Sequence, residues 1–421
     1  MKSQTNAAGS VSRSLKDTRL QVESLHPQAQ PKKTEAGETK MADTEFAKGL
    51  EGVIATTSEI CQVDGVNGKL YYRGYSIQDL AAHSDFEETT YLLLYGKLPT
   101  AQELETFSQC MRGGRELPLA VQAMIRDFPK TGSAMELLQS VISYLSGTVK
   151  HTIQHSATCN CRETLHQIAQ IPVVLATYQR FRDGKEYLAS RSDLSTGANF
   201  LYLIQGKEPT PLEGRILDTC LVLHAEHGLN ASTFTARTVA STLSTCYCSI
   251  SAAIGSLAGP LHGGANERVM DLFDEIGSAD RIDAWLDQAL AEKRKVMGMG
   301  HRVYRTKDPR AVVIESLLQE LSQERKDSTA YDFLKKLETH FAARMEKKGK
   351  AIYPNVDFFS GAVYTLLGIP RDLFTPIFAA ARAPGWLAHI LEQRQDNRIY
   401  RPRALFQGPA PQAYVPVEQR S

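Results

Sequence analysis

The chain lacks the features that mark membrane, secreted or nucleic-acid-binding proteins. No apolar run in its 421 residues approaches the roughly 20 that a transmembrane helix needs, and the N-terminus has no apolar signal-peptide core. Its 48 Lys and Arg residues balance 47 Asp and Glu residues, so no global basic field favours nucleic acid or an anionic membrane surface. Seven sparse cysteines do not form a disulfide framework in a chain of this length. We therefore expect reduced thiols and a cytoplasmic location.

Nucleotide-binding motifs are also missing. No Gly-Lys-Ser/Thr phosphate loop occurs, and the sequence Gly-Met-Gly-His at residues 298–301 lacks the glycine spacing and the preceding strand of a dinucleotide loop. Strands and helices do not alternate as they would around a parallel sheet. No repeat of solenoid period is present.

The pattern that is present predicts a mainly α-helical protein. Apolar residues follow helical spacing within residues 269–276, 282–290, 313–321 and 331–341. Pro354, Pro370 and Pro376 should interrupt later helices or begin new ones. Between Ile60 and Tyr75, turn residues precede strand-prone Leu70-Tyr71-Tyr72, which indicates a short β-hairpin. Residues 1–45 are polar and few are large and apolar, so we expect a disordered tail.

Three ionisable residues stand beside glycine or in turn-forming segments. His262 lies in Gly-Pro-Leu-His-Gly-Gly, His301 in Gly-Met-Gly-His-Arg, and Asp357 in Pro-Asn-Val-Asp-Phe. Taken singly, each is more typical of a loop or helix cap. Together, two imidazoles and a carboxylate suit proton removal and delivery near neutral pH.

Arginines form a second group of candidate residues. Arg302, Arg305 and Arg310 flank His301, and further arginines crowd the C-terminal segment, where a solvated charged face is the ordinary interpretation. Arg382 differs because its neighbours are Ala, Pro, Gly and Trp. A guanidinium in so apolar a segment favours an anionic partner.

Two histidine-containing segments raise the question of a metal site. His224 and His227 are three residues apart, which would place both on one helical face, but they lack the zinc-protease spacing. His227, just before Gly228, fits a helix C-terminus that faces a ligand. The cluster His151, His155, Cys159, Cys161 and His166 has zinc-binding residue types without the usual zinc spacing. No metal is predicted at either segment, and whether the cluster binds one stays open.

Five blocks of this sequence, in order, resemble the citrate synthase family. Residues 300–310, Gly-His-Arg-Val-Tyr-Arg-Thr-Lys-Asp-Pro-Arg, resemble its signature, and residues 259–266 and 355–357 match two further blocks. Residues 224–234 and 400–402 match as well, and the opening 49–80 is similar to the short bacterial and archaeal type. The resemblance runs from about residue 46 to the end. The first 45 residues and the stretch 151–166 depart from the pattern.

The resemblance implies a mainly α-helical, two-domain fold and a homodimer with active sites completed across the interface. The large domain would comprise residues 46–264 and 366–421, and the small domain residues 265–365. The implied reaction joins the acetyl group of acetyl-CoA to oxaloacetate and hydrolyses the thioester to give citrate. Acetyl-CoA would be a co-substrate, with no permanently bound cofactor and no metal.

Residue roles follow from matching positions. Asp357 resembles the base that removes a methyl proton from acetyl-CoA, His262 the group that stabilises the enol, and His301 the group that protonates the oxaloacetate carbonyl. The remaining positions resemble oxaloacetate contacts (His227, Arg310, Arg382 and, from the other subunit, Arg401) and a coenzyme A phosphate contact (Arg305).

Two alternatives remain. A 2-methylcitrate synthase uses propionyl-CoA with the same residues, and one methylene is worth only about 1–3 kcal/mol in an apolar pocket. A non-catalytic, metal-binding or regulatory helical relative should have lost His262, His301 or Asp357, yet all three are present.

Overall fold

The structure, a computed structural model, describes residues 46–148 and 162–420. Its contacts divide the chain into Met1–Thr56 and Thr57–Ser421. The first unit contributes one 3-10 turn, η1 (Lys48–Leu50), to the described residues. The predicted tail of residues 1–45 lies outside them, so that prediction remains untested.

A small antiparallel sheet opens the second unit. Strands β1 (Cys61–Asp64) and β2 (Lys69–Tyr72) form the predicted hairpin, and β3 (Tyr75–Ser76) adds a third strand in the order β1-β2-β3. The carboxylate of Asp64 accepts the backbone N–H groups of Val66 and Asn67 at 3.1 and 2.9 Å, which closes the turn.

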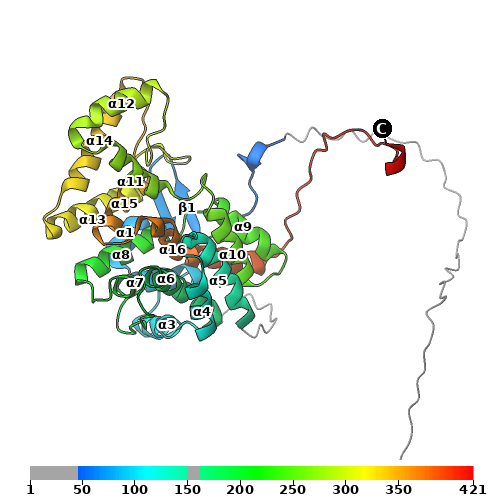
Figure 1. The fold of residues 1–421 in the computed structure, drawn as a ribbon, viewed down its shortest axis with the longest axis horizontal. Coiled ribbons are helices and arrows are strands. Elements are labelled where there is room, and N and C mark those ends of the chain that lie inside the picture. The colour runs from blue at the N-terminus through cyan, green and yellow to red at the C-terminus, as the bar shows by residue number, and fades with distance from the viewer. Residues whose placement is uncertain (1–45, 149–161, 421) are drawn as a thin grey trace, which may run out of the picture. The chain divides into compact units, whose positions relative to one another are not determined.

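The other described residues of this unit are mainly helical, as predicted (Figure 1). No described helix is both long enough and apolar enough to span a bilayer. The first eight α-helices are α1 (Ile77–His83), α2 (Phe86–Tyr95), α3 (Ala101–Gly113), α4 (Leu119–Asp127), α5 (Ala134–Thr148), α6 (Arg162–Arg182), α7 (Thr196–Gln205) and α8 (Pro211–His224). The next eight are α9 (Ala231–Ser241), α10 (Cys246–Leu257), α11 (Ala265–Ile276), α12 (Ile282–Ala291), α13 (Pro309–Arg325), α14 (Thr329–Glu346), α15 (Asp357–Leu366) and α16 (Phe374–Gln395). Short 3-10 turns are η2 (Ala279–Arg281), η3 (Arg371–Leu373) and η4 (Val417–Gln419).

Local sequence explains where several helices begin. A capping box precedes α8, in which Thr210 and Glu213 satisfy each other's backbone N–H groups and Pro211 occupies the first turn. Asn230 caps α9 by accepting the N–H of Thr233 at 3.1 Å. Asp308 caps α13 directly before a proline. The four helices predicted from periodicity between residues 269 and 341 are therefore present as α11 to α14.

The buried helix α16 organises the core. Most of its apolar side chains are buried, and those of Trp386 and Ile390 are completely so. It packs against α2, α6, α8, α9 and α10, while α10 also packs against α5 and α9. A second set of packed helices comprises α11, α13, α14 and α15, with α12 against α14. The loops that join these helices carry the candidate residues.

Candidate active site

The predicted residues come from loops and helix ends that are far apart in the sequence. His227 lies between α8 and α9, His262 between α10 and α11, and His301 between α12 and α13. Asp357 is the first residue of α15. Arg310 lies in the first turn of α13, and Arg382 lies within α16.

Backbone hydrogen bonds bring the His301 loop against the Asp357 loop. The N–H of Gly300 donates to the carbonyl of Tyr353 at 2.8 Å, and the N–H of Asn355 donates to the carbonyl of Gly298 at 2.9 Å. Gly298 has φ +75°, and a Cβ there would lie 2.8 Å from the side chain of Val269. Only glycine fits this close approach without displacement.

The ring of His301 is held in one tautomer. Its Nδ1 lies 3.0 and 3.2 Å from the backbone N–H groups of Val303 and Tyr304, which can only donate. In the neutral imidazole the proton is therefore on Nε2. Burial lowers the pKa of His301 to about 4, assisted by the positive charge of Arg310. The ring is thus a neutral hydrogen-bond donor at physiological pH.

His262 is held in the opposite tautomer. The backbone N–H of Ser232 donates to Nε2 at 3.1 Å, so the proton of the neutral ring is on Nδ1. The Ser232 hydroxyl lies 2.8 Å from the same nitrogen and accepts the indole N–H of Trp386 at 3.1 Å. Burial, then the charge of Arg382, lowers the pKa of His262 to about 4. His262 is therefore a second neutral donor.

Asp357 is positioned through its backbone, and its carboxylate accepts no hydrogen bond from the described residues. Asn355 accepts the N–H of Asp357 at 3.0 Å and donates to the carbonyl of Gly300 at 2.9 Å. Burial raises the pKa of Asp357 to about 6, although the charge of Arg310 opposes this rise. A carboxylate with a raised pKa is a stronger base than an ordinary aspartate.

His227 lies beyond a helix end rather than on a helix. Because α8 ends at His224, the predicted shared helical face of the two histidines is wrong. The Nε2 of His227 lies 3.2 Å from the hydroxyl of Tyr304, and the His227 and His301 ring centroids are 5.2 Å apart. Burial, then the charge of Arg310, lowers the pKa of His227 well below its usual value.

Arg310 forms a buried pair with Asp308. The carboxylate of Asp308 accepts from Nε at 3.0 Å and from Nη2 at 2.7 Å, and both side chains are almost completely buried. This two-point contact fixes the plane of the guanidinium. The positive charge of Arg310 nevertheless lowers the pKa values of His227, His301 and Asp357, so it favours neutral imidazoles and an ionised carboxylate.

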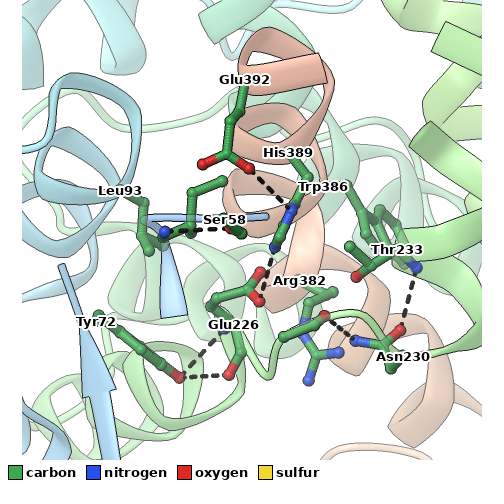
Figure 2. Close-up of polar contacts among 12 residues, drawn as sticks. Ser58, Tyr72, Leu93, Glu226, Asn230, Thr233, Arg382, Trp386, His389 and Glu392 are labelled. Atoms are coloured by element: carbon green, nitrogen blue, oxygen red, sulfur yellow. Dashed lines mark hydrogen bonds and ion pairs between the residues drawn. The ribbon is translucent and has the colours of Figure 1, made fainter. Parts of the chain in front are cut away.

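Arg382 is buried, with one nitrogen anchored. Its Nε donates to the carbonyl of His224 at 2.6 Å, and the guanidinium lies over the ring of Phe378 at 4.7 Å. Neither terminal nitrogen makes a hydrogen bond to the residues described (Figure 2). Because its charge lowers the pKa values of His262 and His227, Arg382 belongs to the same site.

The structure does not bring Arg305 or Arg401 into this group. Both side chains are exposed, and neither forms an ion pair with the described residues. The backbone N–H of Arg305 donates to the carbonyl of Gly65 at 2.8 Å, which ties the His301 loop to the β-hairpin. Tyr400, just before Arg401, is anchored through its N–H to the Ser241 hydroxyl at 3.1 Å.

No metal-binding group is found in residues 46–148 and 162–420, where no three His, Cys, Asp or Glu side chains gather to hold an ion. Of the His151–His166 cluster, only His166 lies within these residues, in α6. The other four members of the cluster lie outside the described part of the chain, so the question of a metal there stays open.

Sequence reasoning missed three residues that shape the site. Asp308 could have been found, because Asp-Pro before an amphipathic run signals a helix cap. No local pattern pointed to Ser232, which lies in α9 and sets the tautomer of His262 in the loop between α10 and α11. Tyr304 occurs within the motif of residues 300–310, which assigned it no role, yet it contacts the rings of both His227 and His301.

Comparisons with known proteins identify the family to which this chain is similar. A family model described as "Citrate synthase, C-terminal domain" matches residues 49–403. The citrate synthase of Acidithiobacillus ferridurans is 44% identical over 390 residues, which is 90% of this chain and all of that protein. The 2-methylcitrate synthase of Shewanella oneidensis is 38% identical over 375 residues, covering 88% of this chain and 97% of that one.

Solved structures give the same result. The crystal structure of citrate synthase from Thermotoga maritima has 42% identity and a TM-score of 0.79, covering 90% of this chain and 100% of that one. A ternary complex of citrate synthase from Thermoplasma acidophilum with carboxymethyl coenzyme A and oxaloacetate has 34% identity and a TM-score of 0.83, covering 89% and 100%. Because the family model matches residues 49–403 and these relatives are covered over nearly their whole length at up to 44% identity, the chain belongs to the citrate synthase family.

Proposed function

We propose that this protein condenses acetyl-CoA with oxaloacetate and hydrolyses the product to citrate and CoA. One observation carries the proposal. Two neutral imidazoles, each with its proton on a defined nitrogen, share a site with a carboxylate of raised pKa and two buried arginines. Such a site can remove a proton from a weak carbon acid and stabilise the oxygen that gains charge.

The first step would be enolisation. Asp357 takes a proton from the methyl group of acetyl-CoA while the Nδ1–H of His262 donates to the thioester oxygen. Both are needed, because a thioester methyl is a very weak acid and a carboxylate alone is a poor base for it. The neutral state of His262 suits a donor to an enol oxygen.

The second step would form the carbon–carbon bond. The enol carbon attacks the ketone of oxaloacetate, and the Nε2–H of His301 polarises and then protonates the ketone oxygen. Water then cleaves the thioester of the citryl-CoA intermediate, releasing CoA and citrate. No resident cofactor takes part in these steps, and acetyl-CoA is consumed as co-substrate.

Oxaloacetate would be held by its two carboxylates. Arg310 and Arg382 provide the guanidinium groups, with Arg401 supplied by the partner subunit of a homodimer and His227 as a further contact. Arg305 would contact a coenzyme A phosphate. The exposure of Arg305 and Arg401 in a single chain is consistent with partners outside it.

The domain division is part of the same proposal. Residues 265–365 would form a small domain that closes on a large domain of residues 46–264 and 366–421, shielding the enol from water. The packing of α11, α13, α14 and α15 on one another supports this division. The thiols of Cys61, Cys110, Cys220 and Cys248 form no disulfide among the described residues, which supports a reducing, cytoplasmic location.

The test is the reaction itself. Purified protein supplied with acetyl-CoA and oxaloacetate should release CoA and citrate in equal amounts. Asp357→Asn should abolish exchange of methyl hydrogens from acetyl-CoA, measured with an oxaloacetate analogue bound, while oxaloacetate binding remains. Exchange at the wild-type rate in this variant would refute the assignment of the base.

The 2-methylcitrate synthase alternative rests on the Shewanella oneidensis relative, whose identity of 38% is lower than the 44% of the citrate synthase from Acidithiobacillus ferridurans. Turnover of acetyl-CoA and of propionyl-CoA should be measured side by side. We expect a higher kcat/KM with acetyl-CoA, and the opposite ratio would favour the alternative.

A further inference from the structure

Glu226 is a completely buried carboxylate beside the candidate site, and the chemistry proposed above gives it no role. It lies between α8 and α9, directly before His227. Its backbone is fixed by Tyr72, whose hydroxyl donates to the Glu226 carbonyl at 2.9 Å. Figure 2 shows its carboxylate between His389 and Arg382. A buried charge is costly, so its retention needs a physical reason.

A chain of three side chains holds one oxygen of Glu226. Arg237, which can only donate, reaches Nδ1 of His389 at 3.1 Å. The neutral His389 ring therefore has its proton on Nε2, and it donates to Oε1 of Glu226 at 3.1 Å. Arg237 is held in turn by Glu392 at 2.6 Å. This chain of side chains therefore fixes the position of Oε1.

The other oxygen, Oε2, is buried and has no hydrogen-bond partner among the described residues. It lies against α16, where a Cβ on Gly385 would come within 2.3 Å of it. Arg382 precedes Gly385 by one helical turn, and its Nε is bonded to the carbonyl of His224, two residues before Glu226. The short segment from His224 to Glu226 therefore contacts α16 at two points, at Arg382 and at Gly385.

The two site arginines differ in how their charges are balanced. Arg310 has a direct partner in Asp308. No described acid forms an ion pair with Arg382, whose pKa is lowered by burial and raised most by the charge of Glu226. Glu226 is therefore the acid that balances Arg382 through space. A carboxylate that balances an arginine without binding it leaves the guanidinium free for another anion.

We propose that Glu226 is a positioning residue that acts as the fixed counter-charge of Arg382 and limits how tightly this arginine holds substrate and product carboxylates. The inference rests on the proposed function, in which Arg382 binds oxaloacetate. Citrate carries one more carboxylate than oxaloacetate, so an uncompensated arginine would retain the product longer than the substrate. Glu226 would thus favour product release.

Glu226→Gln tests this with little change of shape, because the amide keeps an acceptor for His389. We expect the dissociation constant of citrate, measured by calorimetry, to fall about ten-fold, which corresponds to about 1.4 kcal/mol. The KM for oxaloacetate and kcat should also fall, while the KM for acetyl-CoA should stay unchanged. A merely structural role would lower the melting temperature without tightening citrate binding.

Two matched variants sharpen the test. Glu392→Gln removes a carboxylate from the same chain of side chains but from its far end, and citrate affinity should change by less than about two-fold because the charge is more distant. Glu226→Asp keeps the charge and should keep the affinity close to that of wild type. Tighter citrate binding in both controls would overturn the assignment to Glu226.

A double variant covers the case in which Glu226→Gln does not fold. Glu226→Gln combined with Arg382→Gln removes both charges, so it should melt at a higher temperature than the single Glu226 variant. Unchanged or weaker citrate binding in a folded Glu226→Gln variant, or a double variant no more stable than the single one, would refute the proposal. Neither result would affect the proposed function, which fails only if the wild type does not form citrate.

Discussion

The raised pKa of Asp357 predicts that its ionised carboxylate, which activity requires, destabilises the folded protein, and that one substitution can test this. A tenfold change in proton affinity corresponds to about 1.4 kcal/mol. A rise in pKa from 3.8 to about 6 therefore corresponds to about 3 kcal/mol. Because the folded protein binds this proton more tightly than the unfolded chain does, the contribution of Asp357 to stability is fully present below pH 3.8 and is lost as the pH rises through about 6.

Asp357→Asn removes the titrating group while keeping its size. Above pH 6 the variant should be more stable than wild type by up to about 3 kcal/mol, because the buried negative charge is gone. Below pH 4 the difference should disappear. Melting curves of both proteins from pH 4 to pH 8 measure this, and a gain of a few degrees is expected at pH 7. Asp127→Asn is the control, since Asp127 is exposed and forms no ion pair among the described residues.

The same pKa should govern activity. The kcat/KM of wild type should be half-maximal near pH 6 and fall about ten-fold for each unit below it, because only ionised Asp357 can accept the proton. His262 and His301, with pKa values of about 4, stay neutral over this range and add no second step. An acid limb centred near pH 4, or an Asn variant that melts below wild type at pH 7, would refute the reasoning.

Three further outcomes are expected. Arg401→Ala should leave the dimer assembled but weaken oxaloacetate binding. Mixing Arg401→Ala subunits with Asp357→Asn subunits should partly restore activity, because one site of each mixed dimer carries neither defect. Verified mixed dimers without activity would disprove a role of Arg401 across the interface. Tyr304→Phe should raise the KM for oxaloacetate about two- to ten-fold by removing one hydrogen bond to a site histidine; an unchanged KM would show that the hydroxyl is dispensable. Gly385→Ala should lower the melting temperature, at a cost of about 1–3 kcal/mol, because its Cβ would lie 2.3 Å from two oxygens, whereas Gly113→Ala, which meets nothing within 4 Å, should not.

Much of the fold could be predicted because helical periodicity is a local signal. The stretch from residue 269 to residue 341 shows this, since each predicted apolar run lies within a helix. The hairpin was also local, with Asp64 and Asn67 supplying its turn. His227 shows the limit of local reasoning, because a spacing of three implied a helix that ends at His224.

The candidate site was predictable as a set of residue types but not as an electrostatic arrangement. The motifs pointed to His262, His301 and Asp357, which the fold gathers around two arginines. The tautomers of His262 and His301 depend on backbone N–H groups, among them that of Ser232 in α9, and no sequence pattern reveals such contacts. Glu226 lies within the matching block 224–234, but no sequence pattern distinguishes it, because its burial and its partner His389 on α16 depend on tertiary packing.

The contacts of Glu226 also bear on how the protein folds. Its carbonyl accepts from Tyr72 across 154 residues of sequence, and the neighbouring carbonyl of His224 accepts from Arg382 across 158. Contacts of such sequence separation form late, because a long loop must be closed before they contribute. The helices can therefore form while the anion-binding site is still incomplete. Recovery of oxaloacetate binding on refolding should accordingly lag behind recovery of the helical signal.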